Sequence, residues 1–252
     1  MRALLPQSSA DVDVHSFYAA DWVETGGLRV DFVASVDGAA QAEGRSAGLQ
    51  TPGDNRVFAA LRDLADVVLV GGGTATTEGY RPIVVGEQRL AIRRRYGLRD
   101  VLPTAVLSRN LNLDPGAPLF RGSSPAAPTI VLTCAAAPAD RRAALAEVAD
   151  VVLCGDDLVD PAAARAALEE RGLRRILSEG GPTAFADLAR GGVVDELCLS
   201  LTPFLVGPGA SRITGGPTAW AAPADLTLVG ALEEDGALFL RYRMPGTMSS
   251  SA

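Results

Sequence analysis

The segment RRILSEGGPTAFADLARGG, residues 174–192, joins a short apolar run to a helix through a carboxylate and two glycines. The run at 174–178 has the length and apolar character of a buried strand. Pro182 is favoured in the first turn of a helix, and Gly191-Gly192 end that helix. A buried strand that leads directly into a helix is the repeating unit of a sheet covered by helices. The segment therefore predicts an α/β fold.

Strand and helix patterns alternate through most of the chain. Strands are expected at 28–35, 67–70, 103–108, 128–133, 150–154 and 195–203, and helices at 54–66, 138–149 and 161–171. Residues 114–128 are rich in turn-forming types and are expected to be a surface loop. Residues 225–243 predict a β-hairpin that turns at Asp235-Gly236. The pattern indicates a mostly parallel mixed sheet with helices on both faces and antiparallel C-terminal strands.

The chain shows no internal repeat and no convincing domain boundary. Its 252 residues suit one large α/β domain. We expect one α/β domain at 28–244, an N-terminal extension at 1–27 and a flexible tail at 245–252.

The composition disfavours nucleic acid and membranes as partners. The formal net charge is −7, whereas both partners reward a basic surface. No apolar run has the length of a signal peptide or a membrane span. The three cysteines are scattered without a C-x-x-C pair, which favours a reduced, cytoplasmic protein.

The residue types present exclude most catalytic schemes. His15 is the only histidine, so neither a Ser-His-Asp triad nor a zinc cluster is expected, and we expect no metal. All 23 basic residues are arginine, which excludes a lysine Schiff base. No G-x-x-x-x-G-K-[ST] loop occurs. What remains is chemistry done mainly by a cofactor that the protein holds and orients.

Three segments are candidates for holding a cofactor. In VVLVGGGTATTEG (67–79) and RILSEGGPT (175–183), a buried strand runs into glycines and then threonine, where backbone N–H groups attract phosphate. Glycines that only form a turn are the alternative, but two such segments favour a dinucleotide. In AVLSRN (105–110), Ser108 and Arg109 end a strand, and this pair favours the 2′-phosphate of NADP. An exposed turn arginine is the alternative there.

Five segments then occur in the order typical of one enzyme family. They are VASVDGAA (33–40), LRDLADVVLVGGGT (61–74), AVLSRN (105–110), ILSEGGPT (176–183) and VVDELCLSLTPFLVGPG (193–209). On these segments the chain resembles the reductase domain of riboflavin biosynthesis, the pyrimidine reductases with a dihydrofolate reductase-like fold. The resemblance implies a three-layer αβα fold, NADPH as cofactor and a homodimer. Many bacteria fuse this domain to a zinc-dependent deaminase, of which this chain carries no motif.

The resemblance also implies roles for single residues. Glu179 matches a position that contacts the substrate, Ser46 and Arg62 fall where the substrate is held, and Asp37 lines the site. Asp37 and Glu179 are therefore the candidate catalytic acids. The resemblance and the three cofactor segments described above together give the residues expected at the cofactor. These are Gly48, Gly73, Thr74, Glu78, Ser108, Arg109, Gly180, Gly181, Pro182, Thr183 and Ala184.

Simpler interpretations of the same residues stay open. Glu179 is also suited to complement a helix dipole, Arg62 to a solvated helix face, and Asp37 to an Asx turn before Gly38. Two positions depart from the family pattern. Asp31 stands where the family usually has a lysine, and TATTEGYRP (74–82) lacks the family's aspartate-proline-arginine motif for the ribose phosphate.

These observations favour an NADPH-dependent reductase of a pyrimidine substrate, similar to 5-amino-6-(5-phosphoribosylamino)uracil reductase, which reduces a ribosylamino group to a ribitylamino group. Hydride transfer depends on positioning, and a proton must also be delivered, by water or by an acid such as Asp37 or Glu179. A dihydropterin substrate and an NADP-binding protein without turnover are the alternatives.

Overall fold

The computed structural model describes residues 1–218, 220 and 222–246. Within them, one ten-stranded sheet has the order β1-β9-β10-β8-β2-β7-β3-β4-β5-β6. The strands are β1 (Arg2–Leu5), β2 (Gly27–Ser35), β3 (Val67–Gly71), β4 (Thr104–Leu107), β5 (Ile130–Thr133), β6 (Asp150–Leu153), β7 (Arg175–Ser178), β8 (Glu196–Thr202), β9 (Thr227–Glu234) and β10 (Ala237–Arg243). The part of the expected tail at 247–252 lies outside the described residues.

The sheet is parallel from β8 through β6 and antiparallel among β8, β10, β9 and β1. The expected hairpin is present, with Asp235 and Gly236 both at positive φ in its turn. The helices are α1 (Val14–Ala19), α2 (Trp22–Thr25), η1 (Ser46–Leu49), α3 (Pro52–Leu64), α4 (Gly72–Thr77), α5 (Glu87–Arg95), α6 (Pro118–Arg121), α7 (Ala139–Ala146), α8 (Pro161–Glu169) and α9 (Pro182–Arg190).

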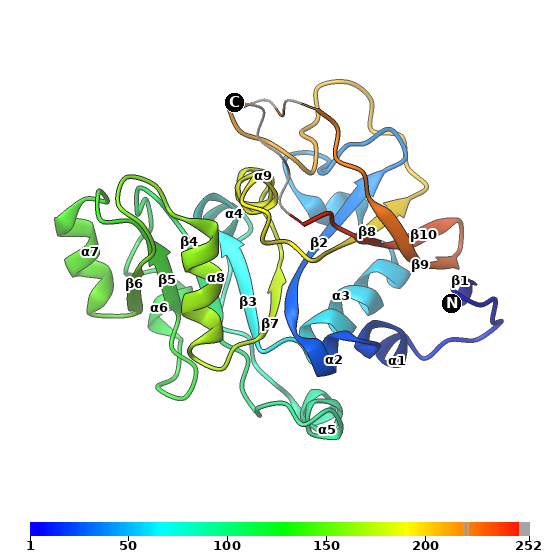
Figure 1. Cartoon of the computed structure of the whole chain (residues 1–252), viewed down its shortest axis with the longest axis horizontal. Coiled ribbons are helices and arrows are strands. Elements are labelled where there is room, and N and C mark those ends of the chain that lie inside the picture. The colour runs from blue at the N-terminus through cyan, green and yellow to red at the C-terminus, as the bar shows by residue number, and fades with distance from the viewer. Residues whose placement is uncertain (219, 221, 247–252) are drawn as a thin grey trace.

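Helices cover both faces of this sheet (Figure 1). On one face, Leu168 of α8 and Phe185 of α9 pack against residues of β2, β3, β5 and β7. On the other face, Leu61 of α3 packs near the centre of the sheet, and Phe120 of α6 and Leu145 of α7 pack over β4 and β5. The expected three-layer αβα architecture, with a mostly parallel mixed sheet and antiparallel C-terminal strands, is confirmed.

One expected loop is partly wrong. Residues 114–128 contain the short helix α6, which begins at Pro118, and both Leu119 and Phe120 are buried. Turn-forming residues lie on both sides of this apolar pair, so the sequence shows no helical pattern there. Burial of the two side chains against the sheet nevertheless stabilises the helix.

The first 27 residues are built into the same sheet and core. β1 pairs with β9 at the edge of the sheet, and Asp13 caps α1 by accepting a hydrogen bond from the amide of His15. Tyr18 and Trp22 are 1% and 2% exposed, so this segment contributes large side chains to the core.

The neighbouring strands β3 and β7 send their helices to opposite faces of the sheet. After β3 the chain enters α4, whose Ala75 packs with β4 and β5, whereas after β7 it enters α9 on the other face. In an open α/β sheet, such a divergence leaves a crevice outside the carboxyl ends of the strands, where ligands bind. No helix among the described residues is long and apolar enough to cross a membrane.

Candidate active site

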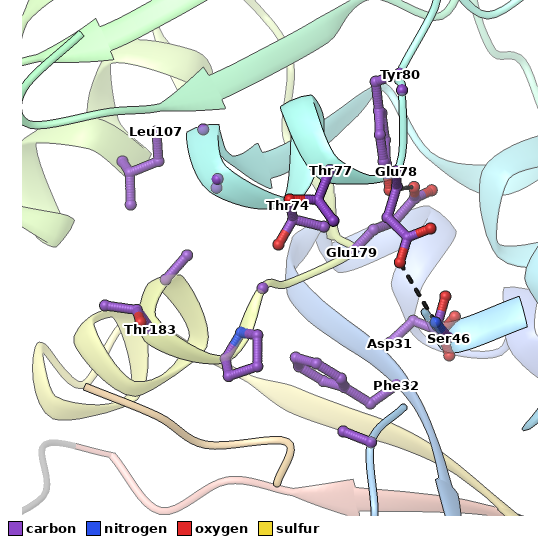
Figure 2. A pocket seen from close by; sticks show the side chains of 18 of the residues that line it. Asp31, Phe32, Ser46, Thr74, Thr77, Glu78, Tyr80, Leu107, Glu179 and Thr183 are labelled. Carbon is purple, nitrogen blue, oxygen red and sulfur yellow. Dashed lines mark hydrogen bonds between the residues drawn. The ribbon is translucent and has the colours of Figure 1, made fainter. Parts of the chain in front are cut away.

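A cavity of about 1020 Å³ opens at this crevice. It is lined by the ends of β3, β4 and β7, the first turn of α9, one side of α3, and the segments around Ser46 and Tyr80. In Figure 2, Leu107 and Thr183 lie at one end of the cavity, and Ser46 and Tyr80 lie at the other. The predicted residues that line it are Ser46, Arg62, Gly73, Thr74, Glu78, Ser108, Arg109, Glu179, Gly181, Pro182, Thr183 and Ala184.

The glycines that follow the neighbouring strands β3 and β7 pack closely against each other, and they are called the glycine turn below. The Gly71 amide donates to the Gly180 carbonyl at 2.7 Å, and the Glu179 amide donates to the Leu69 carbonyl at 2.9 Å. A Cβ on Gly181 would lie 2.1 Å from Thr74 Oγ1, so any larger residue there would force the Thr74 side chain to move. Gly180 has a φ of +81°, and a Cβ on it would lie 2.6 Å from the Phe32 ring. Gly180 therefore serves packing, and it is not among the described residues that line the cavity.

Backbone groups at this end of the cavity are open to a ligand. Gly73 is exposed, and no atom lies within 4 Å of the place a Cβ would take. Pro182, at the first position of α9, and Thr183 follow directly on the turn. Ser108 and Arg109 extend from the end of β4, and a Cβ on Gly72 would lie 3.1 Å from Ser108 Oγ. The structure thus brings all three predicted cofactor segments to one end of the cavity.

Glu179 forms the polar centre of the other half. Arg62 of α3 donates from Nε to Oε1 at 2.6 Å and from Nη2 to Oε2 at 2.7 Å. Tyr80 donates its hydroxyl to Oε2 at 2.6 Å. The Glu179 side chain is only 3% exposed, and a fork-shaped guanidinium is the donor that best compensates a buried carboxylate. Arg62 is therefore held by its partner and is not a solvated helix-face residue.

Burial and the neighbouring charges shift the pKa values of Tyr80 and Arg62. Burial raises the pKa of Tyr80 well above its ordinary value, and the charge of Glu179 raises it further, so the hydroxyl stays a donor. Burial alone would lower the pKa of Arg62, but its hydrogen bonds to Glu179 raise the pKa overall. The guanidinium also stacks over Phe58, with 4.3 Å from Cζ to the ring centroid.

Sequence reasoning missed Tyr80, although it stands in TATTEGYRP (74–82), the segment compared with the family's ribose-phosphate motif. It missed two further acids, Asp31 of β2 and Asp54 of α3, which also line the cavity. A carboxylate in the apolar strand 28–35 is itself a signal, because buried charges are rare without a partner. Asp31 was noted only as a departure from the family.

Ser46 and Glu78 face each other across the cavity mouth. The Ser46 amide donates to Glu78 Oε1 at 3.3 Å (Figure 2). Glu78 was predicted at the cofactor, but this contact places its carboxylate beside the predicted substrate residue. Gly48 is exposed, packs against Ala42, and is not among the described residues that line the cavity.

Asp37 does not lie where the resemblance implied. Its carboxylate accepts from the Ser35 hydroxyl and from the amides of Val206 and Gly207, at 3.2 and 2.8 Å. It is exposed and is not among the cavity-lining residues in the described part of the chain. The hydrogen bond from Ser35, with that from Gly207, lowers the pKa of Asp37, so it is held as a carboxylate. These contacts tie Asp37 to Ser35 and to the loop at residues 206–207, whereas the Ala39 amide of the turn donates to Ser35 Oγ.

No group of three or more His, Cys, Asp or Glu in the described residues could hold a metal ion. The cavity instead combines an open glycine turn at one end with a cluster of arginine, tyrosine and carboxylates at the other. This arrangement can hold a phosphate-bearing cofactor beside a polar heterocycle.

The chain matches the model of the RibD C-terminal domain over residues 27–235. It is 30% identical over 152 residues to the 2,5-diamino-6-ribosylamino-4(3H)-pyrimidinone 5′-phosphate reductase of Methanothermobacter thermautotrophicus, a match over 60% of this chain and 66% of that protein. It is 26% identical over 179 residues to the Archaeoglobus fulgidus reductase of the same name, over 71% of this chain and 80% of that protein. The match to the first relative thus covers slightly less than two thirds of its length.

Among solved structures, the chain is similar to a pyrimidine reductase-like protein from Corynebacterium diphtheriae. The TM-score is 0.82 at 26% sequence identity, and the match covers 93% of this chain and 99% of that one. An Acinetobacter baumannii RibD structure shares the fold, with a TM-score of 0.66 at 17% identity over 90% of this chain and 60% of that one.

Proposed function

The chain belongs to the RibD C-terminal domain family, and on that ground we propose that it is an NADPH-dependent reductase of riboflavin biosynthesis. The reaction reduces the ribosylamino side chain of a pyrimidine 5′-phosphate to a ribitylamino side chain. The proposal draws on the names of the curated relatives and on one structural observation. That observation is one cavity lined by the glycine turn at one end and by the Arg62–Glu179–Tyr80 cluster at the other.

The first end of the cavity fits a nicotinamide dinucleotide. The first turn of the nine-residue helix α9 offers backbone N–H groups, which form the positive end of the helix dipole and attract phosphate. Gly73 is exposed and has no side chain, so it leaves room for a phosphate group. We assign the pyrophosphate to the segment Gly181–Ala184 with Gly73 and Thr74. When bound, the reduced nicotinamide supplies a hydride.

The preference for NADPH over NADH is assigned to Ser108 and Arg109. Both line the cavity beyond the end of β4, and Arg109 is exposed. A hydroxyl beside a guanidinium provides two donors for a 2′-phosphate, which NADH lacks.

The pyrimidine is assigned to the Glu179 end. Among the described contacts, Oε1 of Glu179 accepts one hydrogen bond, from Arg62, and a carboxylate oxygen has two lone pairs. Oε1 can therefore accept one N–H from the edge of a pyrimidine while Arg62 and Tyr80 hold the carboxylate in place. Arg81 lies exposed on the cavity wall next to Tyr80, and we assign the 5′-phosphate to it.

The test is NADPH oxidation by the purified protein. We expect turnover with 2,5-diamino-6-ribosylamino-4(3H)-pyrimidinone 5′-phosphate or its deaminated uracil counterpart, and a product heavier by two hydrogens in mass spectrometry. Dihydrofolate serves as the comparison substrate and should be reduced far more slowly. Oxidation with dihydrofolate but with neither pyrimidine would contradict the proposal.

A variant separates phosphate recognition from chemistry. Arg81→Gln should raise KM for the 5′-phosphate substrate roughly ten- to a hundredfold, because a charge-assisted contact contributes about 1.5–3 kcal/mol, and it should change kcat little. The matched control is Arg2→Gln, because Arg2 is exposed on the edge strand β1 and pairs there with Glu233 of the neighbouring strand β9. An unchanged KM would remove Arg81 from the phosphate site.

We further propose a homodimer that acts in the cytoplasm. Exposed Val36, Phe204 and Leu205 lie together, since the Val36 amide donates to the Phe204 carbonyl, and they offer an apolar contact surface. The described cysteines are all free and buried, which suits a reducing compartment. Light scattering and cell fractionation test the two statements.

A further inference from the structure

Asp31 is a buried carboxyl group that the proposed function leaves unused. It lies in the middle of β2, is 9% exposed and lines the cavity. Its Oδ1 is buried and has no hydrogen-bond partner among the described residues. Burying a carboxylate without a partner is very unfavourable, so such a group is retained where its chemistry is needed.

The surroundings of Asp31 hold more negative charge than positive charge. Asp54 of α3 and Glu179 after β7 face it, and Arg62 is the cation that faces it. Arg62 lowers the pKa of Asp31, but it is bound through both Nε and Nη2 to Glu179, whose negative charge acts on Asp31 in the opposite direction. The neutral titratable groups packed against Asp31 from the other elements are Tyr18 of α1 and Cys198, its register partner on β8.

These surroundings determine the protonation of Asp31. Burial raises its pKa well above the ordinary value, and the charges of Asp54 and Glu179 raise it further. The same burial raises the pKa of Asp54. A carboxylic acid whose pKa is raised in this way keeps its proton to a higher pH than an ordinary aspartate, and it can donate that proton to a bound substrate.

We propose that the Asp31 carboxyl group is the proton donor of the reduction. This inference rests on the proposed function. It replaces the two acids considered from the sequence: Asp37 is an exposed carboxylate bound to backbone amides, and Glu179 is bound to Arg62 and Tyr80. Asp31 is the acid of the cavity whose buried oxygen lacks a described partner.

A reduced nicotinamide nucleotide, the hydride donor of the proposed function, gives two electrons and one hydrogen to the anomeric carbon of the ribosylamine and is oxidised. The bond from that carbon to the ring oxygen breaks, and the Asp31 proton goes to that oxygen, which becomes a hydroxyl group. The carbon is thereby reduced to CH₂, and Asp31 is left as a carboxylate. Solvent at the open cavity then returns the proton.

The first test is single-turnover NADPH oxidation at saturating substrate across a pH series. Wild-type rates should fall as the pH rises through the raised pKa of Asp31, because only the protonated acid donates. Asp31→Asn keeps the size but has no acidic proton, so its rate should drop roughly 10²- to 10⁴-fold and lose this alkaline decline. Asp54→Asn should keep the low-pH rate and shift the decline to lower pH, because one repelling charge is gone.

The control is Asp100→Asn, which removes an exposed carboxylate paired with Arg94 on the surface. It should keep the wild-type rate and pH profile. If Asp31→Asn also keeps them, Asp31 is not the donor, although the proposed function stands. If Asp54→Asn instead abolishes turnover while Asp31→Asn does not, Asp54 is the donor and the inference is overturned.

A second measurement needs no substrate. An acid whose pKa is raised by folding stabilises the protein fully below its unfolded pKa and progressively less as pH rises through its folded value. Asp31→Asn removes that dependence. The melting temperature of the variant minus that of wild type should therefore increase as the pH rises above about 4. A difference that does not change with pH would show that Asp31 ionises normally, and would overturn the inference. If wild type reduces neither pyrimidine, the proposed function fails and the donor role fails with it.

Discussion

Replacement of Glu179 by glutamine should damage both turnover and stability while sparing NADPH binding. The carboxylate accepts two hydrogen bonds from Arg62 and one from Tyr80, all between 2.6 and 2.7 Å. Glutamine keeps the size but converts one acceptor oxygen into a donor, which must then face the N–H of Arg62 or the hydroxyl of Tyr80. The described contacts of the carboxylate are with these two residues and not with the glycine turn, so the cofactor end of the cavity is unchanged.

The expected magnitude follows from burial. The Glu179 side chain is 3% exposed and that of Arg62 is 21% exposed. Removing one partner of a buried ion pair costs about 3–5 kcal/mol, and the lower end applies here because Arg62 keeps some contact with water. At about 2–4 °C per kcal/mol for a chain of this size, the melting temperature should fall by roughly 6–12 °C. Loss of a hydrogen bond to a charged group should lower catalytic efficiency about ten- to a hundredfold.

Three measurements on Glu179→Gln check this reasoning: thermal unfolding, fluorescence titration with NADPH, and turnover with the pyrimidine substrate. The double variant Arg62→Met/Glu179→Gln should recover part of the lost stability, because no unpaired guanidinium then remains buried. A glutamine variant that melts with the wild type would refute the energetic argument. One that weakens NADPH binding but turns over normally at saturating cofactor would assign Glu179 to the cofactor.

Three other substitutions test separate parts of the site. Gly181→Ala places a Cβ 2.1 Å from Thr74 Oγ1 and should lower NADPH affinity by about tenfold or more in calorimetric titration, with secondary structure intact by circular dichroism. Arg109→Ala should weaken NADPH by roughly ten- to a hundredfold and leave NADH nearly unchanged, and equal losses would show a structural role. Tyr80→Phe removes one hydrogen bond to Glu179 and should cost about 1.5–3 kcal/mol in chemical denaturation, with NADPH binding unchanged.

The fold could be predicted from the sequence because its signals are local. Apolar runs of four to eight residues mark the buried strands, and Pro182 and the glycines mark where α9 begins and ends. The strands β7, β3 and β4 are adjacent and parallel, so their carboxyl ends lie side by side. The three segments that follow these strands therefore meet at one cavity. Helix α6 was not predicted, because two buried apolar residues among turn-forming residues give no periodic pattern.

The polar half of the site could not be predicted in the same way. Glu179 is separated in sequence from Arg62 by 117 residues and from Tyr80 by 99 residues. No local sequence pattern indicates that such distant residues are in contact. The resemblance supplied Arg62 and Glu179, but it also supplied Asp37, whose carboxylate binds the loop at Val206 instead. A residue type at a family position does not determine which donors surround its side chain, and those donors decide its charge and its role.

The distribution of cations in this cavity explains why its carboxyl groups differ in chemistry. Arg62 forms its described two-bond carboxylate contact with Glu179, through Nε and Nη2, and Tyr80 adds a third donor to the same carboxylate. Glu179 is therefore held as a fixed acceptor for N–H groups. Asp31 shares the same cavity without a described partner for Oδ1, and its neighbours Glu179 and Asp54 oppose its ionisation. One arginine thus separates an acceptor from a proton donor within a single wall, and substituting Arg62 should disturb both roles at once.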